Sequence, residues 1–229
     1  MKNLVLLHGA IGAKDQLEKL RTAVTGEFSV YSMDFTGHGL RSDERIEFSI
    51  ENFAADLDIF LTKNEIVHPV IFGYSMGGYV AVYHALNFTN CAEKIITLGT
   101  KFNWNPEISL KETKMLNPKV IQEKVPSFAQ QLQVRHGENA WERVLSLTAS
   151  MMMKMGDKNP LTPDDFTRLK IPVCYGLGDR DTMVTLEETY QVYKHTPQGS
   201  FYMLPDTPHP IEKVNELELA FRIFQNASV

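Results

Sequence analysis

The sequence has few of the residues and runs that mark several protein classes. Only 2 of its 229 residues are cysteine, and Cys91 and Cys174 lie far apart among apolar neighbours. Neither a disulfide framework nor a cysteine-based metal site can be built from them, so we interpret both as buried free thiols. No apolar stretch approaches the roughly 18 residues of a membrane span, and the first residues carry no basic region or cleavage site of a secretion signal. We therefore expect a cytoplasmic protein with no membrane partner.

An excess of positive charge is also absent. Lys and Arg total 23 against 28 Asp and Glu, a net charge of −5, so no general field attracts phosphate backbones, and we expect no nucleic-acid partner. No His-Glu-x-x-His, cysteine cluster or calcium loop is present. The segment from Gly9 to Lys14 matches neither the dinucleotide fingerprint nor the Walker pattern. The sequence thus predicts chemistry without a metal or other cofactor.

What is present is ordinary globular material with a regular alternation of elements. Hydrophobic residues make up 43% and charged residues 22% of the chain, and its length fits one domain. Short runs rich in Val, Ile, Leu and aromatic residues are each followed by a turn and a helical pattern. This order is typical of an α/β protein with a doubly wound parallel sheet. The six expected strands are Asn3–Leu7, Phe28–Met33, Val70–Tyr74, Lys94–Leu98, Pro172–Leu177 and Ser200–Leu204.

Several helices between these strands have readable starts. Apolar residues at helical spacing predict a helix over Ile50–Lys63 with Ser49 as its N-cap. Thr185 and Glu188 form a capping box that opens a helix through Tyr193, and the run from Thr162 to Asp165 opens another.

About 70 residues without a strand pattern separate Leu98 from Ile171, and we expect this insertion to be all helical. Asn117 and Pro118 begin one helix, Pro126 interrupts the segment, and a long helix over Glu138–Met155 is ended by Gly156. The face shared by Trp141, Val144, Leu145, Thr148, Met152 and Met155 is most simply explained as core packing. The alternative is that part of this methionine-rich surface lines an apolar cavity.

One motif carries chemistry in a specific context. The apolar run Val70–Tyr74 leads through Gly73-Tyr74-Ser75-Met76-Gly77 into a helical pattern. A serine on so sharp a turn between strand and helix has a strained backbone, and the two glycines avoid collisions with neighbouring elements. Ser75 is therefore the candidate nucleophile, although a serine N-cap between chance glycines would give the same letters.

A serine nucleophile needs a base, and seven histidines compete for that role. His8 and His38 lie in glycine turns where a conformational role is the simpler explanation. His68, His84, His136 and His195 lie in or beside helices and are interpreted as solvated or capping residues. His209 follows the last strand, and loops at the carboxyl ends of parallel strands are where ligands bind. We therefore choose His209.

Two carboxylates after the preceding strand could orient that histidine. Asp179 and Asp181 both follow the strand that ends near Leu177. Their Asp-x-Asp spacing resembles the nucleophile motif of haloacid dehalogenase-like phosphatases, but Met183 stands where that motif has Thr or Val. That motif also opens its chains rather than closing them.

The order Ser75, acid, His209 on successive strand ends resembles the α/β-hydrolase fold. The resemblance covers the whole chain and includes His8-Gly9-Ala10 and Asp34–Gly39. It implies that the backbone amides of Ala10 and Met76 form an oxyanion hole. It also implies a core over residues 1–101 and 169–229 with an inserted helical lid at 102–168. Unlike most of that family, this chain begins at the strand carrying His-Gly, so we expect a purely parallel sheet without the N-terminal hairpin.

The resemblance also chooses between the two carboxylates. Family members read Pro-x-x-x-x-x-Gly-x-x-Asp-x-x-Val in this region. Aligning Pro172 with that proline places Gly178, Asp181 and Val184 at the three later anchors. We therefore expect Asp181 to orient His209, and Asp179 to shape the turn by accepting backbone amides.

These residues predict a serine hydrolase acting on a small ester, thioester or related acyl substrate. Trp104, Trp141 and Met152 are the candidate substrate contacts, and a homodimer is a further hypothesis. Two alternatives stay open, because fold alone does not choose function. One is a carbon–carbon bond hydrolase or lyase using the same triad, and the other is a ligand-binding protein with little turnover. A peptidase is disfavoured because the lid would hinder a chain substrate, and a haloalkane dehalogenase would have Asp at position 75.

Overall fold

The six expected strands form one sheet in the computed structural model, which describes residues 1–90 and 92–227. Their order across the sheet is β2-β1-β3-β4-β5-β6, and every pairing is parallel. No antiparallel hairpin adjoins the sheet within the described chain, as expected. The strands are β1 (Lys2–Leu7), β2 (Phe28–Met33), β3 (Val70–Tyr74), β4 (Lys94–Leu98), β5 (Val173–Gly178) and β6 (Gly199–Leu204).

The register of the strands brings their carboxyl ends to one edge. Leu7, the last residue of β1, pairs with Met33 at the end of β2 and with Gly73 near the end of β3. Gly178 at the end of β5 pairs with Leu204 at the end of β6. The loops that follow β1, β3, β5 and β6 therefore converge on one region, which is where an open parallel sheet binds ligands.

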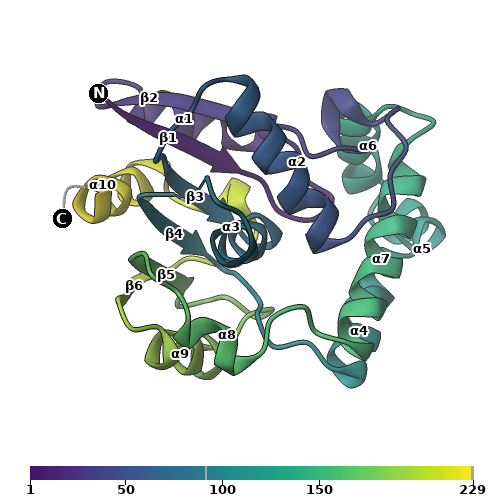
Figure 1. The fold of residues 1–229 in the computed structure, drawn as a ribbon. Helices are drawn as coiled ribbons and strands as arrows, with labels where there is room; N and C mark the ends of the chain where they lie inside the picture. The colour runs from purple at the N-terminus through teal and green to yellow at the C-terminus, as the bar shows by residue number, and fades with distance from the viewer. Residues whose placement is uncertain (91, 228–229) are drawn as a thin grey trace.

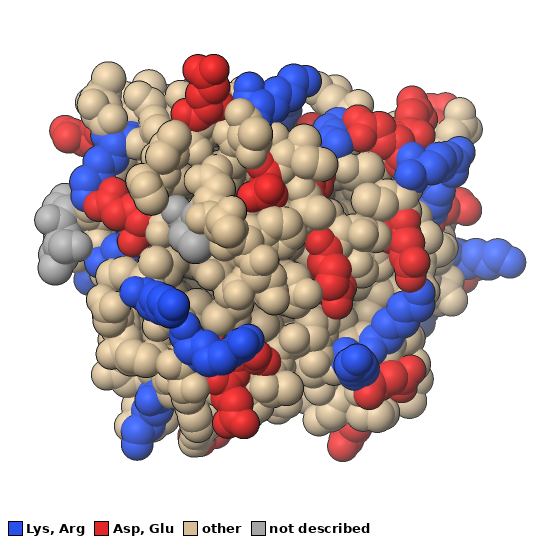
Figure 2. Space-filling view, viewed as in Figure 1, with Lys and Arg blue, Asp and Glu red and all other residues tan. Residues whose placement is uncertain are grey.

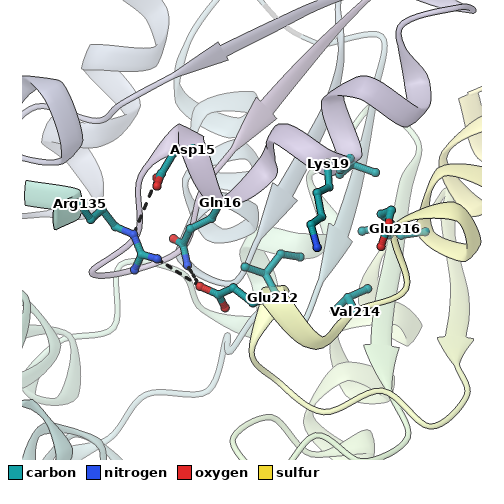
Figure 3. Close-up of a pocket in the computed structure, with 10 residues that line it drawn as sticks. Asp15, Gln16, Lys19, Arg135, Glu212, Val214 and Glu216 are labelled. Carbon is teal, nitrogen blue, oxygen red and sulfur yellow. Dashed lines mark hydrogen bonds and ion pairs between the residues drawn. The ribbon is translucent and has the colours of Figure 1, made fainter. Parts of the chain in front are cut away.

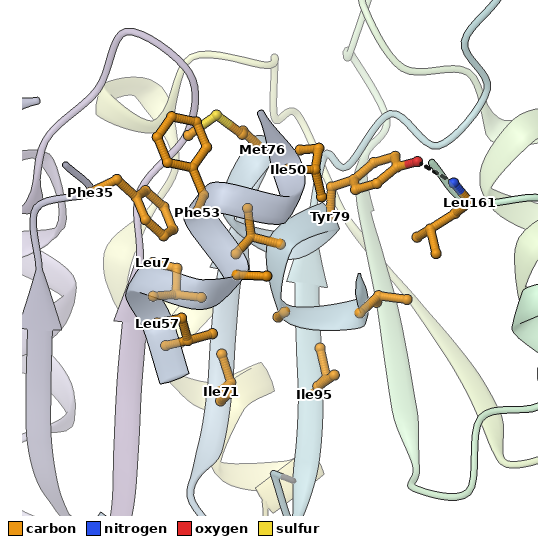
Figure 4. Close-up of a cluster of buried hydrophobic side chains, with 14 of the residues drawn as sticks. Leu7, Phe35, Ile50, Phe53, Leu57, Ile71, Met76, Tyr79, Ile95 and Leu161 are labelled. Atoms are coloured by element: carbon orange, nitrogen blue, oxygen red, sulfur yellow. Dashed lines mark hydrogen bonds between the residues drawn. The ribbon is translucent and has the colours of Figure 1, made fainter. Parts of the chain in front are cut away.

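Helices cover both faces of the sheet, because successive strand residues point to opposite sides. Leu4 and Leu6 of β1 pack with α1 (Glu18–Val24) and α10 (Glu216–Ala227). Val5 and Leu7 pack on the opposite face with α2 (Ile50–Lys63) and α3 (Met76–Asn87), where Figure 4 shows Phe53, Leu57 and Ile71 in the same buried cluster as Leu7. Helix α9 (Leu186–His195) covers β5 and β6.

The expected helix caps are present, with one helix longer than predicted. The Ser49 hydroxyl accepts the amide of Asn52 at 3.1 Å, and Thr185 forms its capping box with Glu188. The helix that Thr185 opens runs to His195 rather than Tyr193. Three short 3₁₀ turns complete the core: η1 (Lys14–Leu17), η2 (Gly39–Arg41) and η4 (Ile211–Lys213).

The insertion is helical throughout, and most of it stands beyond the carboxyl edge of the sheet (Figure 1). Its helices are α4 (Pro106–Thr113), η3 (Lys114–Leu116), α5 (Pro118–Lys124), α6 (Pro126–His136) and α7 (Trp141–Asp157). The following α8 (Pro163–Thr167) instead packs against α9, and its Phe166 joins the main core. We therefore call α4 to α7 the lid.

Pro126 interrupts the segment as expected, because α5 ends at Lys124 and Pro126 begins α6 at its first turn, where a missing N–H costs nothing. Two expectations about the long helix were wrong in detail. The long helix begins at Trp141 because Gly137 ends α6 with φ +89° and a turn follows it. Gly156 does not end the helix but lies inside α7, which runs to Asp157. A Cβ on Gly156 would approach the Ser109 Oγ of α4 to 2.1 Å. Glycine at this position permits close packing of α4 on α7.

The charged side chains are distributed as on an ordinary globular protein (Figure 2), and the described cysteine is buried. Acidic and basic side chains are interspersed on the face shown in Figure 2, with no broad region of one sign. None of the helices in the described chain is both long and apolar enough to cross a bilayer. Cys174 is buried in β5, and burial raises the pKa of its thiol, whereas Cys91 lies outside the described residues.

Candidate active site

The turn between β3 and α3 holds Ser75 in a rare backbone conformation. Ser75 has φ +51°, a left-handed value that non-glycine residues seldom adopt, and it directly precedes α3. A Cβ on Gly73 would come within 2.4 Å of the Gly78 amide, and one on Gly77 within 2.6 Å of the Leu7 carbonyl. Only glycine fits at these two positions, so the local sequence produces the turn that presents the serine.

The sequence-predicted acid and base meet. Nδ1 of His209 donates to Oδ2 of Asp181 at 2.7 Å, and Oδ1 of Asp181 accepts the amides of Met183 and Val184 at 2.8 and 2.9 Å. Burial alone would raise the pKa of Asp181, but the hydrogen bond and charge of His209 and the two amides outweigh it and lower the pKa. Asp181 is thus held as a carboxylate, which fixes the imidazole with Nε2 directed elsewhere.

Asp179 does what the sequence predicted for the other carboxylate. Its Oδ1 accepts the amide of Thr207 at 3.0 Å, which braces the loop before His209. The amide contact with Thr207 is the main cause that lowers the pKa of Asp179. Asp179 makes no hydrogen bond to His209.

The end of β4 joins Ser75 to the Asp181–His209 pair. The Ser75 amide donates to the Leu98 carbonyl at 2.9 Å, and the Thr100 hydroxyl donates to the Ser75 carbonyl at 3.0 Å. Gly99 lies between Leu98 and Thr100 in the chain, and a Cβ on it would lie 3.2 Å from Oδ2 of Asp181 and 3.3 Å from the His209 ring. On its other side, the Tyr74 hydroxyl donates to the His209 carbonyl at 2.9 Å. The three candidate residues therefore occupy one region around Gly99.

The loop after β1 forms the opposite wall. The Gly12 amide donates to the Gly9 carbonyl at 3.1 Å, which closes a turn with Ala10 and Ile11 at its centre. A Cβ on Gly9 would come within 3.2 Å of the Ser75 Cβ, so this turn lies directly against the serine. The amides of Ala10 and Met76, which the sequence suggested as an oxyanion hole, thus flank Ser75 from two different strand ends.

A small cavity opens at Ser75 beneath the lid. Its volume is about 40 Å³, and most of its wall is apolar. Trp104 and Met152, two of the three candidate substrate contacts, line it. The lining residues are Ala10, Ile50, Ser75, Met76, Tyr79, Lys101, Trp104, Met151, Met152 and Met155. Within the described chain, no three His, Cys, Asp or Glu side chains are grouped to hold a metal ion.

Trp141, the third candidate contact, lies elsewhere. It is 3% exposed and packs with Ile121, Ala129, Leu132 and Leu145 in a core internal to the lid. Trp141 begins α7, and Met152 follows about three turns later along the same face. One end of that face therefore touches the lid core and the other lines the cavity, which helical spacing alone does not distinguish.

Lys101 is a cavity residue that the sequence reasoning missed. Its ammonium lies 3.7 Å from a carboxylate oxygen of Glu112 in the lid and 3.5 Å from one of Glu188 in α9. Lys101 comes three residues after the end of β4, and its place at the carboxyl edge of the sheet was the signal that could have found it. The cavity therefore contains one cation, which two acidic side chains already engage.

The remaining buried histidines are structural, and two of them were misread. His8 and His38 have the conformational role expected: Nδ1 of His8 donates to the Gly9 carbonyl at 2.8 Å, and the His38 ring stacks on Phe48. His84 and His136 are fully or nearly fully buried rather than solvated. Burial lowers the pKa of all four, that of His8 to about 4.

Comparison with known proteins places this geometry in a family. The sequence profile described as serine aminopeptidase, S33, matches residues 1–216. A 2-succinyl-6-hydroxy-2,4-cyclohexadiene-1-carboxylate synthase from Yersinia pseudotuberculosis is 25% identical, over 84% of this chain and 78% of the relative. An enol-lactonase from Burkholderia xenovorans superposes with a TM-score of 0.79 and 16% identity, covering 100% of this chain and 92% of that one. A thermophilic esterase from Thermogutta terrifontis gives 0.76 and 20%, covering 99% and 90%.

Proposed function

We propose that this chain, which belongs to the serine aminopeptidase S33 family of α/β-hydrolases, hydrolyses a small ester or thioester through an acyl-enzyme on Ser75. The observation that carries the proposal is the Asp181–His209 pair, with its 2.7 Å hydrogen bond, packed over Gly99 beside the strained Ser75. A serine acylates readily only when a positioned base takes its proton, and this arrangement supplies both the base and the group that orients it.

In the acylation step, Oγ of Ser75 attacks the substrate carbonyl carbon while Nε2 of His209 takes the hydroxyl proton. Asp181 stabilises the imidazolium that forms, and the amides of Ala10 and Met76 donate to the developing oxyanion. When the tetrahedral intermediate collapses, the bond to the leaving alcohol or thiol breaks. His209 returns its proton to that leaving group, and the acyl group stays on Ser75.

In the deacylation step, the same groups act on water. His209 takes a proton from a water molecule, whose oxygen attacks the acyl carbon of the Ser75 ester. The second tetrahedral intermediate expels Oγ of Ser75, which recovers its proton from His209, and the carboxylic acid leaves. The enzyme is then in its starting state, so the cycle consumes only ester and water.

The cavity favours a short, uncharged acyl group. Its volume of about 40 Å³ is well below the ~150 Å³ of a cavity that holds a benzene ring, so a long chain does not fit without movement of the lid. The methionines and Trp104 supply apolar contact, and the Lys101 ammonium is already engaged by Glu112 and Glu188.

Carbon–carbon bond chemistry is the second candidate, favoured by the similarity over 84% of this chain to a cyclohexadiene-carboxylate synthase. The same serine and histidine would then move protons on a carbon acid rather than form an acyl-enzyme. An enzyme of that kind would turn over a diketone or cyclohexadiene substrate and ignore simple esters.

A series of p-nitrophenyl esters of increasing acyl length tests the proposal. We expect the acetyl and propionyl esters to give the highest kcat/KM, with a fall as the chain lengthens. Ser75→Ala should abolish turnover, while Ser109→Ala, on a lid helix away from the cavity, should retain it. Turnover of none of the esters by the folded parent protein, or full activity of Ser75→Ala, would contradict ester hydrolysis at this site.

A further inference from the structure

The end of α6 is where the lid meets the loop that carries Ala10. His136, the last residue of α6, is 2% exposed and lies between two loops of the core. Its Nδ1 accepts the amide of Gly39 at 3.0 Å, and its Nε2 lies 2.9 Å from the carbonyl of Ile11. One lid side chain thus bonds to the loop after β1 and to the loop after β2.

The partners of His136 determine its protonation state. Gly39 offers an N–H, so Nδ1 must carry a lone pair, and Ile11 offers a carbonyl, so Nε2 must carry the proton. The ring is therefore neutral with a single tautomer. Both of its nitrogens are fully used, which leaves the imidazole no freedom to rotate or flip.

The Ile11 carbonyl that receives this bond belongs to a strained turn. Ile11 has φ +52°, in a position of the Gly9–Gly12 turn where glycine or asparagine is usual and a β-branched residue is an outlier. Such a conformation persists only where its surroundings hold it. The lid does this twice, because the Ile11 side chain also packs against the lid core around Trp141 and Leu145.

We propose that His136 is a positioning residue for the oxyanion hole, and that it couples the seating of the lid to the placement of the Ala10 amide. The proposal rests on the proposed function, since it assigns a role within acyl transfer. His136 touches neither substrate nor the reacting atoms. It acts by fixing the carbonyl of Ile11 in the peptide between Ile11 and Gly12. Through the turn that the Gly12 amide closes on the Gly9 carbonyl, this holds the Ala10 amide in place beside Ser75.

The residue before His136 supports this coupling. Arg135 lies 3.8 Å from Asp15 in η1 and 3.2 Å from Glu212 in η4, and Figure 3 shows it between these two acids. Glu212 lies three residues after His209, and it also accepts from Gln16 at 2.6 Å. The end of α6 is therefore tied to the loops that follow β1, β2 and β6. A lid that moves away at α6 must release the Ile11 carbonyl.

Two substitutions of His136, which keep different hydrogen bonds of the ring, test the proposal. His136→Gln can place an amide N–H near the position of Nε2 and keep the bond to Ile11, while His136→Asn places an acceptor near Nδ1 and keeps only the bond to Gly39. We expect His136→Asn to lower kcat for the acetyl ester by about tenfold or more with KM changed less than about threefold, because an oxyanion donor is misplaced while substrate contacts remain. His136→Gln should restore most of kcat.

A matched control separates this effect from the loss of any buried histidine. His84 is also fully buried but lies near the far end of α3, bonded to Asp58, so His84→Asn should lower the melting temperature without a selective loss of kcat. Equal kcat values for His136→Asn and His136→Gln would overturn the proposal and leave ester hydrolysis intact. Absence of ester turnover in the parent protein would instead contradict the proposed function.

If His136→Asn does not fold, amide hydrogen exchange in the parent protein tests whether the Gly9–Gly12 turn is coupled to α6. The proposal requires the Gly12 amide, which closes the strained turn, to exchange with the same opening free energy as the last amides of α6. A Gly12 amide that opens independently of α6 would overturn the coupling.

Discussion

At the residue scale, the two carboxylates after β5 have distinct contacts and should have distinct effects. Asp181→Asn removes the charge that faces His209 and can favour the wrong tautomer, so we expect kcat to fall by about 10⁴ with little change in fold. Asp179→Asn keeps an oxygen for the Thr207 amide and should retain most activity while lowering the melting temperature slightly. Ester turnover and thermal unfolding of both variants check this. A dead, well-folded Asp179→Asn beside an active Asp181→Asn would contradict the assignment.

His209 is the proposed base of both steps of the reaction. Replacing it with alanine removes the base and the acid of both steps, so we expect His209→Ala to lower kcat by at least about 10² while the fold persists. A rate constant within about tenfold of the parent value would assign general-base chemistry to another group.

How much of the site can be predicted from the sequence depends on how far along the chain the contacts lie that position each residue. Ser75 is set by glycines within two positions, and His209 follows from the last strand that the apolar runs mark. The strand before it left Asp179 and Asp181 open, and the family pattern chose Asp181. Lys101 and His136 derive their roles from partners far along the chain, such as Glu188 and Ile11, and no local pattern encodes those contacts. Trp141 was assigned wrongly for the same reason.

At the scale of elements, the packing of α4 on α7 gives a direct test of the lid. A Cβ on Gly156 would meet the Ser109 side chain at 2.1 Å, so Gly156→Ala should force the two helices apart. We expect a loss of about 1–3 kcal/mol in the free energy of unfolding, despite the better helix propensity of alanine.

Gly26→Ala is the matched control for this change. A Cβ at Gly26 would meet nothing within 4 Å, so that variant should be neutral or slightly stabilising when the unfolding of both variants is measured in urea. Equal stabilities of the two variants would mean that α4 and α7 do not pack as closely as described.

The elements themselves were largely predictable, and the error at Gly156 has a tertiary cause. All six strands and the capped starts of α2, α5, α8 and α9 follow from local patterns, because apolar runs and caps act within a few residues. Gly156 was taken as a helix end, although tertiary packing against Ser109 is what requires glycine there. Local propensity yields to packing where two helices approach closely.

At the scale of the whole molecule, the buried histidines predict acid sensitivity. Burial lowers the pKa of His8, His38, His84 and His136 in the folded state, so the unfolded chain binds more protons below its ordinary histidine pKa of about 6.5. Their neutral forms favour folding fully above that pH, and this stability is lost as the pH falls toward about 4. We expect the free energy of unfolding to fall between pH 6.5 and 5, with a limit of about 1.4 kcal/mol per pH unit for a histidine that stays fully neutral in the folded state.

His38→Phe makes this prediction specific. The Nε2 atom of His38 is buried without a hydrogen-bond partner, and its ring stacks on Phe48, so a phenyl ring keeps the packing and removes one titrating group. Urea unfolding at pH 7 and pH 5 should show a smaller loss of stability for His38→Phe than for the parent. An unchanged stability of the parent between these pH values would contradict the account of the buried histidines.

Trapping the acyl-enzyme is the direct test of covalent catalysis by Ser75. The protein is mixed with p-nitrophenyl acetate, quenched in acid during the first turnovers, digested, and examined by mass spectrometry for an acetylated peptide. We expect one acetyl group on Ser75, formed with a burst of p-nitrophenol in the parent and absent from Ser75→Ala. Steady turnover of the ester with the acetyl group on another residue, or with none on Ser75 when the burst is complete, would contradict it.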